Sequence, residues 1–134
     1  ALQIYDFQTK TWSFGPPLPH PQLDNGASGC AHGSKLYVVG GIRELLEDST
    51  LDVVIYDVTT ETWTEGPPLP APRLMHTTLV YQGRVVVIGG GGDPLVLDEA
   101  AGAWVHDPDL VPPLPGIPPD VPLYAAMIAS VPIG

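Results

Sequence analysis

Four histidines and one cysteine are the side chains of this 134-residue chain best suited to bind a metal or to act as a nucleophile. His20, His32, His76 and His106 are scattered along the chain without the spacing of zinc ligands. Cys30 is the only cysteine, so an internal disulfide is excluded and a packed strand thiol is expected. The sequence therefore predicts no metal site and no cofactor.

Two other segments have residue types that bind ions, but neither has a complete motif. The glycine run at 89–92 is not followed by the Gly-Lys-Ser/Thr sequence of a phosphate loop, and no helix is expected there. The acidic residues Glu44, Glu47 and Asp48 are not arranged as a twelve-residue calcium loop, so we expect a solvated acidic surface. No catalytic constellation is visible, and we predict that the chain is not an enzyme.

Charge and hydropathy exclude several classes of partner. The net charge is −10 and only five residues are Lys or Arg, so nucleic acid and anionic membranes are not expected partners. No apolar run approaches the roughly 18 residues of a spanning helix, so membrane insertion is not expected. The lone cysteine favours a reducing compartment, and no leader is visible although the chain begins at Ala1. A cytoplasmic location is therefore expected.

A repeat organises the chain. Residues 2–21 and 53–72 share a Tyr-Asp pair, a Trp six residues after the Asp, and Gly-Pro-Pro-Leu-Pro, all shifted by 51 positions. A third unit keeps the same step from Asp98 to Trp104. A period of about fifty residues indicates a propeller or an array. The residues that mark the repeat are Gly40, Gly41, Tyr56, Asp57, Trp63, Arg73, His76, Gly89, Gly90 and Trp104.

Each unit is predicted to be a four-stranded antiparallel sheet, so the fold class is all-β. Alternating apolar and polar residues predict hairpins with turns at Gln8–Lys10 and Gln82–Gly83, and small residues at 26–32 suit a crowded innermost strand. The proline-rich segments cannot join a sheet ladder and are expected to form extended straps between sheets. The loop at 42–50 is expected to be irregular, with one helical turn as the alternative.

The chain is expected to hold about two and a half to three blades, too few to close a ring alone. The predicted units are strands three and four of a first blade at 1–19, a second blade at 20–70, a third with a short loop and a strap at 71–115, and the inner strand of a fourth at 116–134. We therefore expect either an excerpt of a longer propeller or one partner of an assembly.

These residues together resemble the Kelch repeat. The match is best in the central unit, with VYQGRVVVIGG, IYDVTTETW and GPPLPAPRLMH, where His76 occupies the position of the repeat histidine. The chain departs from the pattern at Gln22, where the central unit has Arg73, and at Leu97, where it has tyrosine. The resemblance implies a β-propeller with the fourth strand of each blade outermost. It also implies a protein-binding platform, although a minority of the family are copper oxidases or sugar mutarotases.

The expected function is a non-catalytic protein–protein interaction module, a scaffold or adaptor that is part of a longer propeller. A structural subunit of a large multiprotein assembly and a carbohydrate-acting enzyme, such as an oxidase or mutarotase, are the alternatives. Partners are expected to be other proteins bound through blade loops, with further blades or other chains completing the ring. Arg73 is expected to bond backbone carbonyls and fix the blade. The residues expected to contact a partner are Leu23, Asp24, Asn25, Arg43, Glu44, Leu45, Leu46 and Glu47.

Overall fold

The computed structural model describes residues 2–20, 26–42 and 50–110, and these residues form β-strands and no helix. This confirms the all-β prediction. The strands are β1 (Gln3–Asp6), β2 (Thr11–Phe14), β3 (Ser28–His32), β4 (Lys35–Val39), β5 (Val53–Asp57), β6 (Thr62–Glu65), β7 (His76–Tyr81), β8 (Arg84–Gly89), β9 (Leu95–Asp98) and β10 (Ala103–His106). The inner strand predicted at 124–131 and the loop at 43–49 lie outside the described residues.

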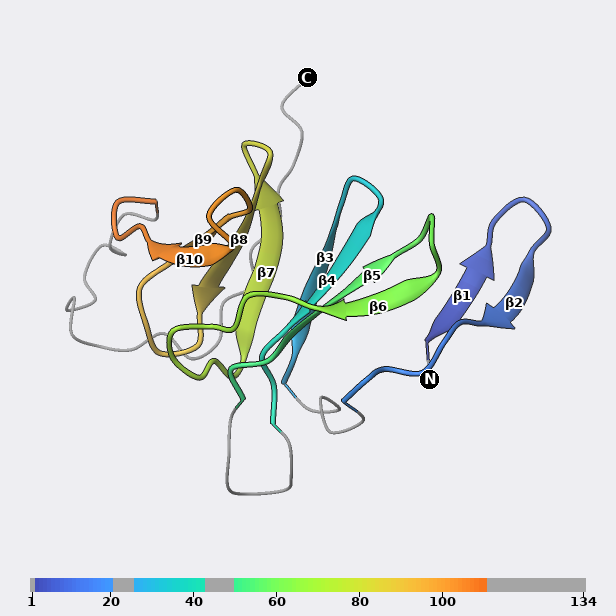
Figure 1. Ribbon diagram of the computed structural model, residues 1–134, viewed down its shortest axis with the longest axis horizontal. Coiled ribbons are helices and arrows are strands. Elements are labelled where there is room, and N and C mark those ends of the chain that lie inside the picture. The colour runs from blue at the N-terminus through green and yellow to red at the C-terminus, as the bar shows by residue number, and fades with distance from the viewer. Residues whose placement is uncertain (1, 21–25, 43–49, 111–134) are drawn as a thin grey trace.

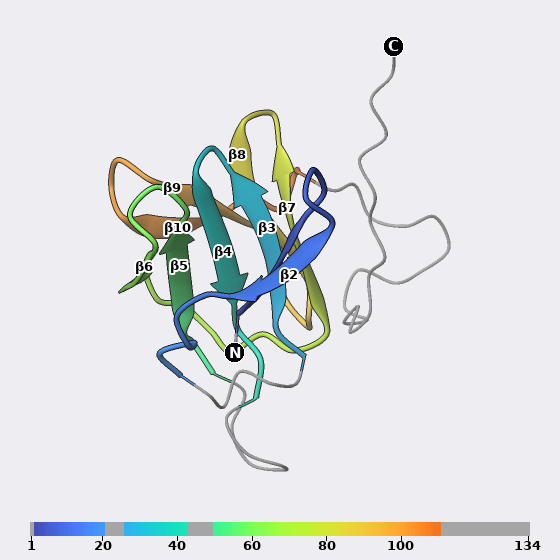
Figure 2. The same cartoon turned by 90° about the vertical axis from the view of Figure 1, so that its right-hand side faces the viewer.

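The strands form one two-stranded sheet, β1–β2, and two four-stranded sheets, β3–β4–β5–β6 and β7–β8–β9–β10. Every pair of neighbouring strands is antiparallel, and each sheet follows chain order. The sheets follow one another along the longest axis of the molecule (Figure 1), and Figure 2 shows them from the β1–β2 end. This arrangement agrees with the predicted fragment of a propeller built of antiparallel blades, with the ring not closed by the described residues.

The aspartate of each repeat unit closes the hairpin turn that follows it. A carboxylate oxygen accepts hydrogen bonds from backbone N–H groups two or three residues later, which is how Asp stabilises a turn without a partner strand. The pKa of Asp6 is lowered by the Thr9 and Gln8 backbone, and that of Asp57 by the Thr59 side chain and backbone. The acceptor and donor pairs are Asp6 with Gln8 at 2.7 Å, Asp57 with Thr59 at 2.8 Å, and Asp98 with Ala101 at 2.9 Å.

The same turns place one residue of each unit in the left-handed region. Lys10, Glu61 and Gly102 occupy equivalent positions, with φ angles of 57°, 55° and 63°. Only the third unit uses glycine, which adopts this conformation without a steric cost. The fixed turn length holds each Trp opposite the residue before the Asp: Tyr5 pairs with Trp12, Tyr56 with Trp63 and Leu97 with Trp104.

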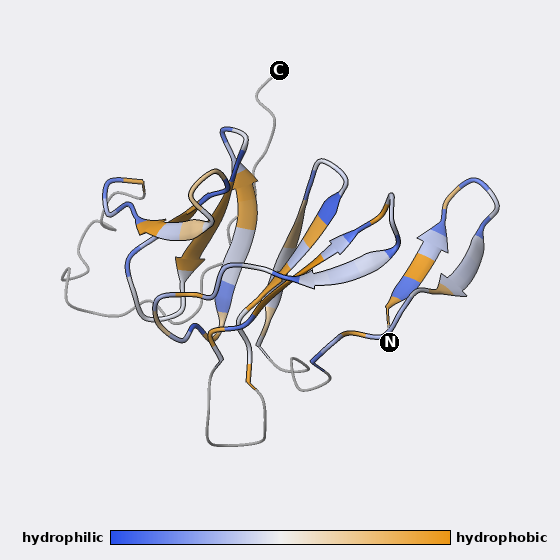
Figure 3. Ribbon diagram, in the orientation of Figure 1, coloured by the Kyte–Doolittle hydropathy of each residue, from blue (hydrophilic) through white to orange (hydrophobic). Residues whose placement is uncertain are grey.

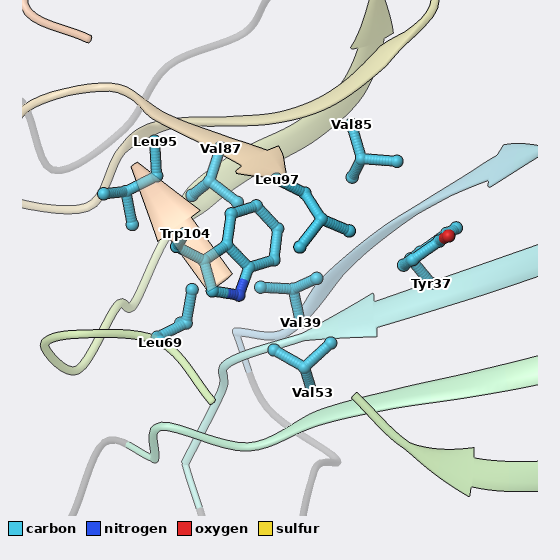
Figure 4. Close-up of a cluster of buried hydrophobic side chains, with 9 residues drawn as sticks. All are labelled: Tyr37, Val39, Val53, Leu69, Val85, Val87, Leu95, Leu97 and Trp104. Carbon is cyan, nitrogen blue, oxygen red and sulfur yellow. The ribbon is translucent and has the colours of Figure 1, made fainter. Parts of the chain in front are cut away.

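The main hydrophobic core lies between the second and third sheets (Figure 4). Figure 3 shows hydrophobic residues along β8 and polar residues at the hairpin turn before it. A smaller cluster of Val86, Ile88 and Val96 occupies the other face of the third sheet. The buried residues of the main core are Tyr37, Val39, Val53, Leu69, Val85, Val87, Leu95, Leu97 and Trp104. Leu69 comes from the second proline-rich strap, so the strap is part of the packing between the sheets.

Candidate functional site

The eight residues expected to contact a partner all lie outside the described residues. They are Leu23, Asp24, Asn25, Arg43, Glu44, Leu45, Leu46 and Glu47. These residues belong to two segments, 21–25 and 43–49, and the structure does describe the backbone on either side of each segment. That framework is the described part of the candidate site.

Backbone hydrogen bonds fix the residues that flank segment 43–49. The Gly40 N–H donates to the Asp52 carbonyl at 2.9 Å, and the Thr50 N–H donates to the Gly41 carbonyl at 2.9 Å. The Thr50 hydroxyl is buried and accepts from the Asp52 N–H at 2.7 Å. The two ends of the segment are therefore held together by a closed ring of hydrogen bonds, the kind of rigid base on which binding loops are usually carried.

The base of segment 21–25 lies beside the same region. Gly26 packs against Leu74, and the Gly41 N–H donates to the Arg73 carbonyl at 3.3 Å. We call Gly26, Gly41, Leu74 and Met75 the loop-end surface. The starts of β3 and β7 lie at the lower end of the view in Figure 1, away from the tips of the β3–β4 and β7–β8 hairpins. The structure thus brings the bases of both predicted contact segments together.

Met75 is a candidate contact residue that sequence reasoning missed. Its side chain is 60% exposed and its φ is 54°, a left-handed conformation that is uncommon for residues other than Gly, Asn and Asp. Strained backbone of this kind is found preferentially at functional positions. Nothing in the sequence marks it, because methionine has no preference for a left-handed position. An exposed, flexible apolar side chain is well suited to contact a partner protein.

Arg73, which precedes Leu74 and Met75 in the chain, anchors the backbone of the loop-end surface. Its side chain is almost fully buried and donates from Nη1 to the Gly89 carbonyl at 3.0 Å and from Nη2 to the Asp93 carbonyl at 2.8 Å. The side chain passes so close to Gly92 that any larger residue there would collide with the guanidinium. Burial lowers the pKa of Arg73, and the Asp93 charge opposes this shift. The glycine run at 89–92 therefore packs against the Arg73 side chain, which bonds to the Gly89 carbonyl.

His76 fills the space next to Gly40. A Cβ on Gly40 would lie 2.8 Å from both the His76 ring and the Arg73 carbonyl, and Gly40 has a φ of 62°. Neither ring nitrogen of His76 has a hydrogen-bond partner of good geometry among the described residues. Burial lowers the pKa of His76; the nearby Val39 backbone opposes this shift, and the Arg73 charge adds to it. Burial therefore favours the uncharged form of the ring, which packs next to Gly40.

The tryptophans join consecutive units. Trp63 donates its indole N–H to the Pro16 carbonyl at 3.1 Å, and Trp104 donates to the Pro67 carbonyl at 2.8 Å. Pro16 and Pro67 are the equivalent first prolines of the two Gly-Pro-Pro-Leu-Pro straps. Each of these two straps therefore accepts a hydrogen bond from the Trp of the next unit, and we call this contact the strap latch. The proline carbonyl is a free acceptor because the strap belongs to no sheet ladder.

A second contact joins the second and third sheets near the hairpin tips. The Tyr37 hydroxyl donates to Glu99 Oε1 at 2.6 Å, and His32 Nδ1 lies 3.6 Å from the same oxygen. The pKa of Glu99 is lowered mainly by the Tyr37 hydrogen bond and further by His32 and Lys35. Burial, together with the Glu99 charge, raises the pKa of Tyr37. Sequence reasoning missed this cluster, since the two partners lie 62 residues apart.

Because of the Tyr37–Glu99 hydrogen bond, the free energy of unfolding is expected to depend on pH in the acidic range. A carboxyl whose pKa is depressed on folding stabilises the protein above its ordinary value of 4.5, and this contribution is lost as the pH falls through the lower folded value. Because the Glu99 side chain is 52% exposed, we expect Glu99→Gln to cost at most about 1 kcal/mol at pH 7. The cost should be smaller at a pH below 4.5 than at pH 7, as measured by urea unfolding at both values. In a Tyr37→Phe background it should be small at either pH, and an equal cost at both pH values in the parent chain would contradict this role.

Other residues with reactive side chains show no common site. Cys30 packs at the edge of the main core, and burial raises its pKa to about 11, so it is a thiol near neutral pH. Within residues 2–20, 26–42 and 50–110, no three His, Cys, Asp or Glu side chains gather as metal ligands would. In the same part of the chain, no helix has the length and apolarity needed to cross a membrane.

Comparisons with known proteins agree on one family. The family model described as Kelch motif matches residues 25–70. Kelch-like protein 40 of Mus musculus is 40% identical over 90 residues, which cover 66% of this chain and 14% of that protein. Kelch repeat and BTB domain-containing protein 13 of Homo sapiens is 34% identical over 124 residues, covering 88% of this chain and 27% of that protein. Kelch-like protein 33 of Homo sapiens is 35% identical over 125 residues, covering 90% and 23%.

The chain thus spans between 14% and 27% of the length of these three relatives. The printed names describe the relatives as Kelch-like or Kelch-repeat proteins, and one of them also as a protein with a BTB domain. The range matched by the family model, residues 25–70, contains the repeat residues Gly40, Gly41, Tyr56, Asp57 and Trp63.

Proposed function

Since this chain belongs to the Kelch-repeat family, we propose that it is a non-catalytic protein-interaction module within a propeller and that it binds its partner at the loop-end surface. One observation carries the proposal: hydrogen bonds and packing bring the bases of segments 21–25 and 43–49 together around Met75. A rigid base from which two segments leave, with an exposed apolar side chain beside it, makes a surface suited to another protein.

The chemistry of the predicted contact residues suggests how a partner is bound. Leu45 and Leu46 are adjacent apolar residues, which contribute to affinity when a partner removes them from water. Arg43 is suited to pair with a carboxylate of the partner, since a guanidinium binds carboxylates in a bidentate manner. The proposed location of this module is the cytoplasm, on the basis of the lone Cys30.

Site-specific photo-cross-linking in the complete protein tests the proposal. A benzophenone amino acid at Met75 or Leu45 is expected to give cross-links to another protein in the native cells. The same probe at Val58 is the control, because Val58 is 57% exposed but lies in the β5–β6 turn. Leu45→Asp and Arg43→Glu should reduce the Met75 cross-link at least about tenfold, as expected for interface residues worth about 1.4 kcal/mol or more. Val58→Asp should not reduce it. Cross-links of equal yield at Val58 and Met75, or at Val58 alone, would overturn this surface.

A structural subunit of a larger assembly is the second candidate function. The observation in its favour is an exposed aromatic side of the β1–β2 hairpin. Phe7, Trp12 and Phe14 are 84%, 67% and 76% exposed, respectively. Apolar clusters of this kind on a soluble protein usually mark a contact with another chain. No observation among the described residues favours a carbohydrate-acting enzyme.

A further inference from the structure

The outer face of the third sheet carries a cleft beside its last strand. β10 is an edge strand of this sheet, and within the described residues it pairs only with β9 (Figure 1). The register places Val105 opposite Val96 and Val96 opposite Val86, so these side chains lie on the face turned away from the second sheet. A cleft of about 440 Å³ opens there, between the start of β8 and the end of β10. We call it the β10 cleft.

The β10 cleft combines an apolar floor with charged groups that have no ionic partner. Val96 and Val105 supply the apolar surface, and Val105 is 51% exposed. Arg84, Asp98 and Asp107 line the same cleft, and none of them forms an ion pair with another described residue. One oxygen of Asp98 is held by the turn after β9, whereas Asp107 uses only its backbone groups in hydrogen bonds within this part of the chain. The cleft therefore offers unpaired carboxylates beside aliphatic surface.

The corresponding corner of the second sheet shows that this region stays accessible when another sheet packs on the same face. The third sheet covers the equivalent face of the second sheet and buries Tyr37. Lys35, the equivalent of Arg84, nevertheless remains exposed. Thr64, the equivalent of Val105, is exposed as well. A neighbouring sheet therefore covers the inner part of such a face and leaves the region of the cleft open.

β10 presents a free edge at which an extended segment can pair. Its residues, Ala103–His106, include no Lys, Arg, Asp or Glu, and charged residues are a usual means of preventing pairing at natural sheet edges. The corresponding end of β6 differs, because Glu65 is bonded there by His20, which follows the first strap, at 2.8 Å. A segment added to β10 would place alternate side chains on the face that holds the cleft.

We propose that the β10 edge and its cleft bind an extended segment of a partner protein that carries a lysine or arginine. The segment pairs with β10 through main-chain hydrogen bonds, and one basic side chain enters the cleft. The aliphatic part of that side chain packs on Val96 and Val105, and its charged end approaches Asp98 or Asp107.

The charge of the lining decides the kind of side chain that is bound. Three carboxylates, of Asp98, Glu99 and Asp107, line the cleft against the single guanidinium of Arg84. A cation is therefore favoured over an anion, and the two valines favour a cation on an aliphatic stem. This surface is separate from the loop-end surface, so the inference does not rest on the function proposed above.

Selection from a displayed library of random nine-residue peptides, with the complete protein as bait, tests the proposal. Peptides bound by the parent are retained, and those that also bind Val105→Lys are discarded, since this variant places a cation in the cleft. The remaining peptides should be enriched at least about fivefold in lysine or arginine at one position, which corresponds to about 1 kcal/mol of preference. Thr64→Lys, at the equivalent position of β6, is the matched control and should bind them like the parent.

Fluorescence polarisation of one selected peptide measures how its basic residue is recognised. Asp107→Asn should weaken binding about threefold, as expected for a partly exposed ion pair, and added NaCl should weaken it further. A peptide with glutamate in place of the basic residue should bind the parent at least about tenfold more weakly, yet bind Asp107→Lys more tightly than it binds the parent. Methylating one of the two alternate sets of backbone nitrogens in the peptide should abolish binding, because that set donates to β10.

Several results would overturn the proposal. They are a selection that leaves no peptide after the Val105→Lys step, retained peptides without enrichment in basic residues, and a glutamate peptide that binds Asp107→Lys no better than the parent. Full binding by both methylated forms would exclude strand pairing. Val105→Lys should leave the Met75 cross-link unchanged, so the loop-end surface is judged by its own test.

Discussion

Replacing Arg73 by alanine is expected to lower the free energy of unfolding by about 3–5 kcal/mol, the usual effect of deleting one member of a buried polar network. The variant would lose two charge-assisted hydrogen bonds, one to the buried Gly89 carbonyl and one to the part-buried Asp93 carbonyl. A cavity would remain beside Gly92. Since a whole domain is stable by only about 5–15 kcal/mol, this change removes a large share of the total. Urea unfolding followed by tryptophan fluorescence measures it.

Arg84→Ala is the matched control for Arg73→Ala. Arg84 is an exposed arginine at the start of β8, and its removal is expected to change stability by less than about 0.5 kcal/mol. Arg73→Lys should fall between the two, because one ammonium cannot reproduce both bonds of the planar guanidinium. If Arg73→Ala were within about 1 kcal/mol of the parent, the two carbonyls would have to find other donors, and the supporting role would be wrong.

Alanine substitutions of the three repeat tryptophans are expected to have strongly graded effects. Trp104→Ala should cost about 3–5 kcal/mol, because it removes a buried indole from the main core and breaks the bond to Pro67. Trp63→Ala should cost about half as much, and Trp12→Ala less than about 0.5 kcal/mol in the monomer. Thermal and urea unfolding of the three variants at the same low concentration measure the order.

The tryptophan series carries its own control, since the residue type and the hairpin position are the same in all three variants. Trp104→Phe separates packing from hydrogen bonding and should cost about 1–2 kcal/mol. Equal costs at positions 12, 63 and 104 would mean that the hairpin alone, and not the preceding strap and sheet, determines the contribution of the tryptophan.

The local structure of the repeat could be predicted from the sequence because it depends on residues close together in the chain. Alternation over residues 3–6 and 11–14 predicted the first hairpin, and the turn at Gln82–Gly83 follows from two residues with positive φ angles of 49° and 71°. The family was recognised from the same local signals. The Pro-rich segments at 16–19 and 67–70, which cannot pair with strands, were correctly predicted to be non-strand connections.

The contacts between units could not be predicted in the same way. A period of 51 residues shows that Trp12 and Trp63 are equivalent, but it does not show which strap each one bonds. Tyr37 and Glu99 form their hydrogen bond across two sheets, and neither residue belongs to the repeat pattern. The left-handed Met75 is set by the packing of Leu74 against Gly26 and Gly90, which only the assembled sheets provide.

The strap latch and the Tyr37–Glu99 hydrogen bond differ in whether the residues that form them recur in every unit. A latch needs only a tryptophan and the first proline of a strap, so any unit of this type could follow any other and still be joined. Tyr37 and Glu99 have no counterparts in the repeat: Val58 and Phe7 occupy the positions equivalent to Glu99. A chain with its second and third units exchanged would therefore keep latches between its blades but leave the Tyr37 hydroxyl without its acceptor. The strap latch is therefore compatible with the addition or duplication of blades. The Tyr37–Glu99 hydrogen bond, in contrast, forms only when the second and third units follow one another in this order.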